Sequence, residues 1–361
     1  MRILFVIPSL GPGGAERVAS LLVNDWVDDG HEVTLVTFEM PGAEPFFALD
    51  PRVNTQLLAA DSSRRGVAAR LGANVARVAR LRSTLKELRP DTVVAFMTEA
   101  NVVALAAAKG LGIPVVVSER NQPDRPGLGR LHKLARRLTY PSASAIVAQT
   151  EDIADWAKQF GVPVEMIPNP VALEPEPKRP AESSPAIVAM GRLTYQKGFD
   201  ILVKSFAAVA GQHPEWRLVI HGEGPERGAL RRLAAESGCE DRISLPGLAK
   251  DSGAMLREAS LFVLPSRFEG YPNVLIEALA AGLPVIATSC PGASEEIVAG
   301  GDHGLLVPPD DVAALGNALD IMMSSPDLRS GYAARARDAV AKIETSVIAK
   351  RWLDRLAGLG G

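Results

Sequence analysis

The chain has 361 residues, of which 47% are hydrophobic and 22% charged, which is ordinary for a soluble globular protein. At about 150 residues per domain this length predicts two domains, each able to bury its own core. The net charge of −3 excludes a protein built as a whole to bind nucleic acid. The two cysteines, Cys239 and Cys290, form no CxxC pair, which favours a reducing compartment over a disulfide framework.

The amino terminus, Met1–Pro8, is too short an apolar run for a signal peptide and predicts a buried first strand. No stretch reaches about 18 uninterrupted apolar residues, because Lys109 and Pro114 interrupt the best candidate, Val102–Val117. We therefore expect no transmembrane helix and a cytoplasmic protein, with peripheral contact at the inner face of the cell membrane left open.

Short runs of Val, Ile and Leu, bounded by Gly, Pro or Asp, alternate with helix-like segments such as Ala15–Val27 and Ile153–Phe160. Such runs are typical of strands buried on both faces of a parallel sheet. The expected strands are Arg2–Pro8, Glu32–Phe38, Val53–Leu58, Asp91–Met97, Pro114–Ser118, Ala145–Thr150, Val164–Ile167, Ala186–Gly191, Trp216–His221, Arg242–Leu245, Leu261–Pro265, Pro284–Thr288 and Gly304–Val307. This pattern predicts an α/β protein with two tandem doubly wound, Rossmann-like domains. Since such sheets bind ligands beyond their carboxyl ends, we expect the two domains to face a cleft.

A proline-rich segment separates the two halves, with six prolines between Pro168 and Pro185. Prolines at this density predict neither helix nor sheet, so the segment is interpreted as a linker. The expected organisation is an N-terminal domain over 1–170, a linker over 171–185 and a C-terminal domain over 186–345. A final helix over 346–361 is expected to pack back towards the N-terminal domain.

The first motif of the C-terminal half, Gly191–Gly198, follows an expected strand and leads into a helix over Phe199–Val209. Arg192 and Lys197 would flank the start of that helix, where free N–H groups and the helix dipole attract anions. The motif predicts a diphosphate site, although an exposed turn with two ordinary charges fits the motif alone equally well. The glycine turn His221–Pro225, after the next strand, is a weak signal.

The second motif is Ser266–Gly282, which begins where the strand Leu261–Pro265 ends. Pro272 suits a first helical position, so a helix is expected from Asn273 to Gly282, with free N–H groups at Asn273 to Leu275. Glu269 would precede this helix and Glu277 would lie one turn inside it. Two carboxylates so placed can bind two sets of hydroxyls, as on a ribose and a hexose, whereas two exposed glutamates by accident fit poorly.

The spacing E-x7-E from Glu269 to Glu277, with Gly-Arg-Leu and Lys-Gly upstream, resembles the retaining nucleotide-sugar glycosyltransferases of the GT-B fold (group 1, family 4 type). The resemblance spans nearly the whole chain, from Gly13-Gly14 to the last helix. It implies that the C-terminal domain holds the donor and the N-terminal domain the acceptor. It also implies catalytic roles for Arg192 and Lys197 at the donor diphosphate and for Glu269 at the donor sugar. The donor-binding residues that it implies are Gly13, Gly14, Gly270, Tyr271, Pro272, Asn273, Val274 and Glu277, with Glu277 on the ribose. No cofactor is expected, because the nucleotide sugar is a co-substrate.

A rival interpretation comes from the loop Ser9–Glu16, in which Gly11-x-Gly13 follows the first strand and Glu39 follows the second. This pattern is typical of a nicotinamide-dependent oxidoreductase. Glu16, however, stands where the third glycine should allow close packing, and the rival leaves the C-terminal motifs unexplained. An isomerase or a non-catalytic sugar-nucleotide binder on the same fold is a further alternative.

The chain contains no Asp-x-Asp, the motif that holds Mg²⁺ in many glycosyltransferases. We therefore expect no metal site and a metal-independent reaction, with Arg192, Lys197 and the helix start neutralising the leaving diphosphate. The resemblance implies retention of anomeric configuration. No carboxylate stands out as a nucleophile, so same-face attack is favoured, with the departing phosphate taking the acceptor proton.

The transferred group is expected to be a hexose or N-acetylhexosamine, with UDP favoured because uracil is the family's commonest base. The segment Ser118–Pro123 should end a strand on the acceptor side, with Glu119, Arg120 and Asn121 where relatives carry a histidine. This variant is similar to family members that extend polyprenyl-diphosphate-linked glycans. It implies a role in cell-surface polysaccharide or glycoconjugate synthesis, with a small soluble acceptor as the alternative.

Two basic amphipathic segments lie in the N-terminal half, Ser62–Arg89 and Arg125–Tyr140. Such helices favour anionic membrane surfaces, although the solvated face of a core-packed helix is the commoner case for one helix alone. Two in one domain predict contact with an anionic membrane. The basic residues concerned are Arg64, Arg65, Arg70, Arg77, Arg80, Arg82, Lys86, Arg89, Arg125, Arg130, Lys133, Arg136 and Arg137.

Overall fold

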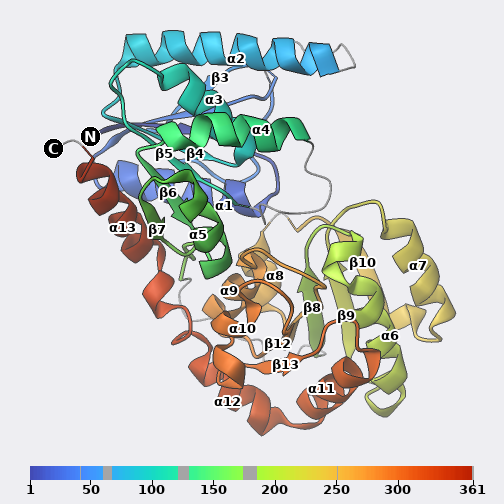
Figure 1. Cartoon of the computed structure of the whole chain (residues 1–361). Coiled ribbons are helices and arrows are strands. Elements are labelled where there is room, and N and C mark those ends of the chain that lie inside the picture. The colour runs from blue at the N-terminus through green and yellow to red at the C-terminus, as the bar shows by residue number, and fades with distance from the viewer. Residues whose placement is uncertain (41, 60–66, 121–129, 174–184, 250, 360–361) are drawn as a thin grey trace. The chain divides into compact units, whose positions relative to one another are not determined.

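A computed structural model describes residues 1–40, 42–59, 67–120, 130–173, 185–249 and 251–359, without the side chains of 67–71 and 130. Within it the chain forms two compact units, Met1–Pro170 with Thr345–Gly361, and Val171–Glu344 (Figure 1). Of the expected linker, 174–184 lies outside the described residues. Val171, the first residue of the expected linker, instead forms a parallel β-bridge with Glu344 in the second unit.

The first unit contains a seven-stranded parallel sheet in the order β3-β2-β1-β4-β5-β6-β7. Its strands are β1 (Arg2–Val6), β2 (Glu32–Thr37), β3 (Asn54–Leu57), β4 (Thr92–Phe96), β5 (Val115–Ser118), β6 (Ala145–Ala148) and β7 (Val164–Met166). Its helices are α1 (Gly14–Asp28), α2 (Val67–Leu88), α3 (Thr98–Ala108), α4 (Arg130–Thr139), α5 (Glu151–Ala157) and α13 (Thr345–Ala357).

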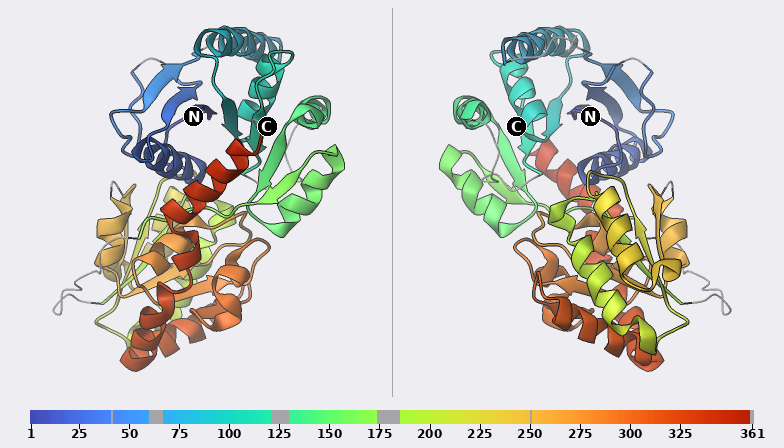
Figure 2. Two further views of the ribbon diagram at one scale, coloured as in Figure 1. Left: turned by 90° about the vertical axis from the view of Figure 1, so that its left-hand side faces the viewer. Right: turned by 90° about the vertical axis from the view of Figure 1, so that its right-hand side faces the viewer.

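Helices cover both faces of this sheet, which is why its central strands are apolar on both sides. Helices α2 and α3 pack against one face, where Leu81 and Leu85 of α2 are fully buried (Figure 1). On the other face α13 runs next to α1 (Figure 2). The Trp26 indole donates to the Ala349 carbonyl, and its ring contacts that of Trp352. The last helix thus belongs to the core of the first unit.

The second unit contains a six-stranded parallel sheet in the order β10-β9-β8-β11-β12-β13. Its strands are β8 (Ala186–Met190), β9 (Arg217–His221), β10 (Ile243–Gly247), β11 (Leu261–Leu264), β12 (Val285–Thr288) and β13 (Leu305–Val307). Its helices are α6 (Phe199–Val209), α7 (Arg227–Glu236), α8 (Ser252–Arg257), α9 (Asn273–Ala280), α10 (Ser294–Ile297), α11 (Val312–Ser324) and α12 (Pro326–Ala336). Figure 1 shows β8 and β9 between α6 and α7 on one side and α8 to α10 on the other.

Two doubly wound parallel sheets are therefore present, and each of the thirteen expected strands is found. Both sheets reverse their winding beside the first strand of the unit, between β1 and β4 and between β8 and β11. In open α/β sheets the crevice for a ligand forms at this reversal, beyond the carboxyl ends of the strands. Among the described residues, no helix is both long and apolar enough to cross a membrane.

Candidate active site

The two C-terminal motifs meet at the winding reversal of the second sheet. Strand β8 leads into Gly191–Gly198, and its neighbour β11 leads into Ser266–Pro272. Because the strands are parallel and adjacent, both loops leave the same edge of the sheet. Residues 72 apart in the chain are thereby brought into contact.

Lys197 and Glu269 form the centre of this contact. The Lys197 Nζ donates to Glu269 Oε1 at 2.6 Å, and the side chains are only 14% and 6% exposed. The Ser266 hydroxyl donates to the same carboxylate oxygen at 2.5 Å. A lysine ammonium has three N–H donors, so two remain for a further anion. Arg192, in the same loop, is exposed and has no ion-pair partner among the residues described.

Two glycines allow the backbone to support this pair. Gly191 leaves room for Lys197, because a Cβ there would lie 3.1 Å from the lysine Cε. Gly198 precedes α6 with φ of +63°, and a Cβ there would lie 2.1 Å from the Pro265 carbonyl oxygen. Only glycine fits such a left-handed position against another backbone. The loops after β8 and β11 therefore touch without intervening side chains.

Arg267 joins the same two loops a second time. Its guanidinium makes two hydrogen bonds of 2.9 Å to Asp200 in the first turn of α6, and a third of 2.6 Å to the Tyr195 carbonyl. It also donates to Asp310 at 2.6 Å and stacks 4.0 Å from the Tyr195 ring centre. Burial would raise the pKa of Asp200, but the hydrogen bonds and charge of Arg267 hold it below its ordinary value. These contacts of Arg267, which we call the Arg267 clamp, fix the turn that carries Lys197 relative to the loop that carries Glu269.

The loop after β12 contacts the backbone of Glu269 and of its neighbour Ser266. The Glu269 amide donates to the Pro291 carbonyl at 2.9 Å. Gly292, with φ of +122°, approaches so closely that a Cβ would lie 2.4 Å from the Glu269 carbonyl oxygen. Thr288 donates to the Ser266 carbonyl at 2.5 Å. Sequence reasoning assigned no role to Thr288 or Gly292, although the Pro-Gly pair after a strand is a usable turn signal.

The start of α9 corrects one expectation. Of the three amides predicted to be free, that of Asn273 donates to the Tyr271 carbonyl at 3.0 Å and that of Leu275 to the Pro272 carbonyl at 2.9 Å. Only Val274 of the three has no amide hydrogen bond within the described chain. Glu277 is half-buried one turn into α9, as expected from its spacing. Gly270 accepts from the Ala293 amide at 3.2 Å, which fixes this loop to the one after β12.

Two glutamates accept hydrogen bonds from the glycine-containing loop Ser9–Glu16. Ser9 donates to Glu16 at 2.8 Å, and a Cβ on Gly13 would lie 2.1 Å from the Glu16 carboxylate. Gly13 caps α1 and Gly14 is its first residue. Glu39, which the rival interpretation places on a ribose, accepts from the Leu10 amide at 3.1 Å. Both glutamates thus have a local role in shaping the loop.

The Glu119 carboxylate, expected on the acceptor side, is 1% exposed beyond the end of β5. It accepts from Thr98 at 2.5 Å and Tyr140 at 2.6 Å, and Arg136 lies 3.4 Å away. Burial raises the pKa of Glu119, against the opposing effect of Arg136 and the two hydroxyl groups. Burial and the neighbouring Glu119 charge also raise the pKa of Tyr140.

Arg120 stacks 3.9 Å from the Phe96 ring centre and donates to Ser118 at 3.4 Å. Asn121 lies outside the described residues. The structure therefore places two of the three residues that were predicted for the acceptor side beside one another at the carboxyl end of β5, with Glu119 buried and Arg120 half-buried.

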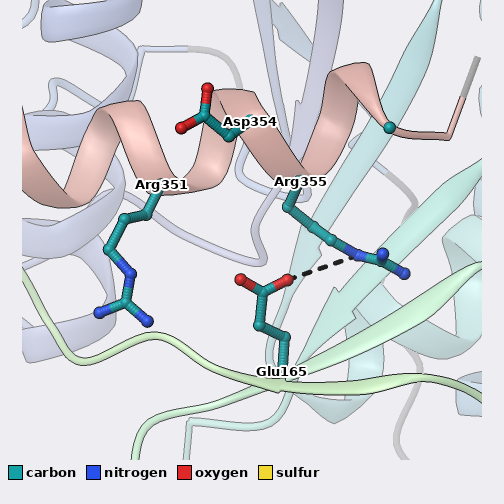
Figure 3. A pocket seen from close by; sticks show the side chains of 5 residues that line it. Glu165, Arg351, Asp354 and Arg355 are labelled. Carbon is teal, nitrogen blue, oxygen red and sulfur yellow. Dashed lines mark ion pairs between the residues drawn. The ribbon is translucent and has the colours of Figure 1, made fainter.

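A hollow of about 350 Å³ lies elsewhere in the first unit, between β7 and α13 (Figure 3). Glu165 points towards Arg355, 3.6 Å away, and Arg351 donates to the Met166 carbonyl at 2.6 Å. Both arginines thus connect α13 to β7, the edge strand of this sheet. None of the predicted site residues lines this hollow. In the part of the chain that the structure describes, no three His, Cys, Asp or Glu side chains gather as metal ligands.

Comparison with known proteins identifies the family of the chain. Residues 13–170 match a glycosyl transferase 4-like domain, and residues 184–325 match the model for glycosyl transferases group 1. An uncharacterized glycosyltransferase of Haemophilus influenzae is 28% identical, with 91% of this chain and 92% of that protein covered. The chain is a glycosyltransferase of the GT-B fold.

The chain is also similar to a second sequence relative and to a solved structure. An alpha-1,4-N-acetyl-D-galactosaminyltransferase of Campylobacter jejuni, named for a PP-undecaprenol-linked glycan, is 27% identical, with 99% of this chain and 98% of that protein covered. Among solved structures, Anabaena HepE in complex with UDP and glucose superposes with a TM-score of 0.82. It is 20% identical, with 99% of this chain and 100% of that chain covered, and this likeness bears on the fold.

Proposed function

We propose that this glycosyltransferase moves a hexose or N-acetylhexosamine from a UDP-sugar to a lipid-linked glycan, with retention and without a metal ion. The acceptor we favour is a glycan on a polyprenyl diphosphate, as an intermediate of cell-surface polysaccharide or glycoconjugate synthesis. The Campylobacter jejuni relative, named for such an acceptor, and the UDP in the HepE complex support this choice.

The observation that carries the proposal is the contact between Lys197 and Glu269 at the winding reversal of the second sheet. A cation with two spare donors lies beside a carboxylate that can accept sugar hydroxyls. Arg192 adds a second, exposed cation in the same loop. This set matches what a sugar diphosphate presents, namely two negative phosphates next to a ring of hydroxyl groups.

In the proposed reaction the sugar C1–O bond to the diphosphate breaks while the acceptor oxygen attacks C1 on the same face. The acceptor proton passes to the departing phosphate oxygen. Lys197 and Arg192 stabilise the negative charge that grows on the leaving diphosphate, and a preorganised cation in a partly dry site is effective in this role. Glu269 orients the sugar, and Glu277 binds the ribose.

A donor panel tests the proposal. Calorimetric titration with UDP-glucose, UDP-N-acetylglucosamine, UDP-galactose, UDP-N-acetylgalactosamine and GDP-mannose should give saturable binding to one or more UDP-sugars. Product NMR should then show the anomeric configuration of the donor. Tight binding of NAD(H) with no binding of any nucleotide sugar would overturn the proposal, and transfer to small soluble sugars alone would overturn the acceptor assignment.

A further inference from the structure

The glycine turn after β9 packs directly onto the loop Gly191–Gly198, which carries the two proposed donor cations. The Gly191 amide donates to the His221 carbonyl at 3.0 Å. At Gly222 and Gly224 a Cβ would lie only 1.9 Å and 2.4 Å from carbonyl oxygens of that loop. Only glycine allows two backbones to approach so closely. The turn after β9, a weak signal in the sequence, therefore forms one wall with the loop after β8.

His221, the last residue of β9, lies at the carboxyl edge of the second sheet, where it pairs with Met190 of β8. Because side chains alternate between the two faces of a strand, its ring shares a face with Val219. Val219 and Met190 both pack against the apolar cluster that includes Leu275 of α9. The His221 imidazole therefore lies on the side of the sheet covered by α8 to α10 (Figure 1), which is also the side of Glu277.

One nitrogen of the His221 imidazole is buried and unpaired in the part of the chain that the structure describes. This atom is Nδ1, which finds no hydrogen-bond partner there. Burial lowers the pKa of His221 below its ordinary value, so the ring is neutral near pH 7. A neutral imidazole donates from one ring nitrogen and accepts at the other. Leaving a buried polar atom unpaired costs free energy, and such costs are typically retained at functional sites.

We propose that His221 determines donor specificity by hydrogen bonding through Nδ1 to the nucleoside half of the UDP-sugar. The inference rests on the proposed function, in which Lys197 meets the diphosphate and Glu269 the sugar. The order of the strands is β9-β8-β11, with neighbours about 4.8 Å apart, so His221 lies one strand from the loop of Lys197 and two from that of Glu269. With the sugar at Glu269, the nucleoside on the other side of the diphosphate extends towards β9.

The chemistry of the ring favours the same part of the donor. A phosphate is best met by a cation, whereas His221 is neutral near pH 7. Ribose hydroxyls and the edge of uracil both donate and accept hydrogen bonds, and a neutral imidazole can pair with either. The nucleoside is therefore a better partner for His221 than the diphosphate.

Three substitutions at His221 test the proposal by calorimetric titration with UDP. His221→Leu removes both ring nitrogens and should weaken UDP binding by about fivefold, the net effect of one hydrogen bond. His221→Asn keeps a polar group close to the position of Nδ1, so it should retain more affinity than His221→Leu. His221→Gln places its amide near the position of Nε2 and should not. Equal UDP affinity of His221→Leu and the unchanged protein would overturn the proposal.

Thermal unfolding without ligand separates a donor contact from a structural role. Leucine replaces a buried, unpaired nitrogen by an apolar group, so the unfolding midpoint of His221→Leu should stay the same or rise. A fall of the midpoint would show that the fold requires the imidazole, and would count against the proposal.

His303 provides the matched control. It is also half-buried, and its Nδ1 is likewise buried and unpaired among the described residues. It precedes β13, however, and so lies at the amino edge of the sheet, opposite the candidate site. His303→Leu should bind UDP like the unchanged protein, and a loss equal to that of His221→Leu would refute a local contact at His221.

A series of ligands then identifies the contacted group. Pyrophosphate should bind His221→Leu and the unchanged protein equally, and a penalty as large as that for UDP would overturn the nucleoside assignment. A smaller penalty with 2′-deoxy-UDP or 3′-deoxy-UDP than with UDP would assign the contact to the ribose. An equal penalty with both analogues would assign it to the uracil.

The two proposals fail in distinguishable ways. If His221→Leu binds UDP normally while K197M does not, the role of His221 is removed and the donor site remains. If the unchanged protein binds neither UDP nor pyrophosphate, the proposed donor site is wrong and the contact with His221 falls with it.

Discussion

Replacing Lys197 by methionine tests whether the lysine acts on the donor or only holds Glu269 in place. The pair is nearly buried, with 14% and 6% of the two side chains exposed, so its loss also affects folding. Removing one partner of a buried ion pair costs about 3–5 kcal/mol, a large share of the roughly 5–15 kcal/mol that stabilises a domain. K197M should therefore lower the free energy of unfolding by about that amount.

The double variant K197M/E269Q separates the two roles. A neutral glutamine leaves no uncompensated carboxylate and can still accept from the Ser266 hydroxyl, which lies 2.5 Å from the Glu269 oxygen. Replacing both charges of a buried pair is often nearly neutral, so most of the lost stability should return. Transfer should not return, because the cation that we propose for the leaving diphosphate is still absent. The expected loss is about 2–4 kcal/mol of transition-state stabilisation, or about 30- to 900-fold in kcat/KM.

Urea unfolding followed by circular dichroism measures the first effect, and initial rates of transfer from the donor identified by the panel measure the second. E269Q alone serves as the matched control for the loss of the carboxylate charge. If the double variant recovers both stability and near-normal kcat/KM, Lys197 serves only to neutralise Glu269, and its assignment to the diphosphate is refuted.

Four further outcomes are expected. Glu277→Ala should lower kcat/KM about 30-fold or more with little change in the unfolding midpoint, and an unchanged KM for the donor would contradict a ribose contact. EDTA should leave transfer intact, whereas full loss restored by Mg²⁺ or Mn²⁺ would show that a metal is required. Arg267→Lys should cost about tenfold in kcat/KM with the KM for the acceptor unchanged, because lysine cannot reproduce the two-pronged bond to Asp200; equal rises in both KM values would refute this. Glu119→Gln should gain stability relative to the unchanged protein as the pH rises above about 4.5. The reason is that a carboxyl whose pKa is raised in the folded state stabilises the fold while it is protonated, and this stabilisation is lost as it ionises. A stability difference between the two proteins that does not change with pH would contradict the raised pKa of Glu119.

The strands were predictable because a strand buried on both faces is a run of apolar residues ended by turn formers. The expected strand Leu261–Pro265, for example, became β11 over Leu261–Leu264, which is buried throughout. Ends were less accurate, since a strand stops where its neighbour stops offering hydrogen bonds. The pairing of Val171 with Glu344 was not predictable, because the partners are far apart in the chain and the bridge has no apolar pattern.

For the candidate site, the sequence allowed prediction of which residues lie at the strand ends, but not of the contacts between them. Lys197 and Glu269 were both expected at the donor, but their 2.6 Å contact was not, because no local pattern reports the distance between two loops. Ser266 and Arg267 stood inside the recognised motif without a role. Arg136 was predicted with the other basic residues of its segment, but it is buried beside Glu119. Helical spacing shows that the two faces of a helix differ, but it does not show which basic residue pairs with a buried carboxylate.

What brings the site together is the order of the strands. The chain runs from β8 outward through β9 and β10, and then returns to place β11 directly beside β8. That return puts the loops of Arg192, Lys197 and Glu269 side by side, and the Arg267 clamp then fixes their separation. In the proposed reaction Lys197 stabilises the charge on the leaving diphosphate, and such stabilisation depends on holding the cation within a fraction of an ångström.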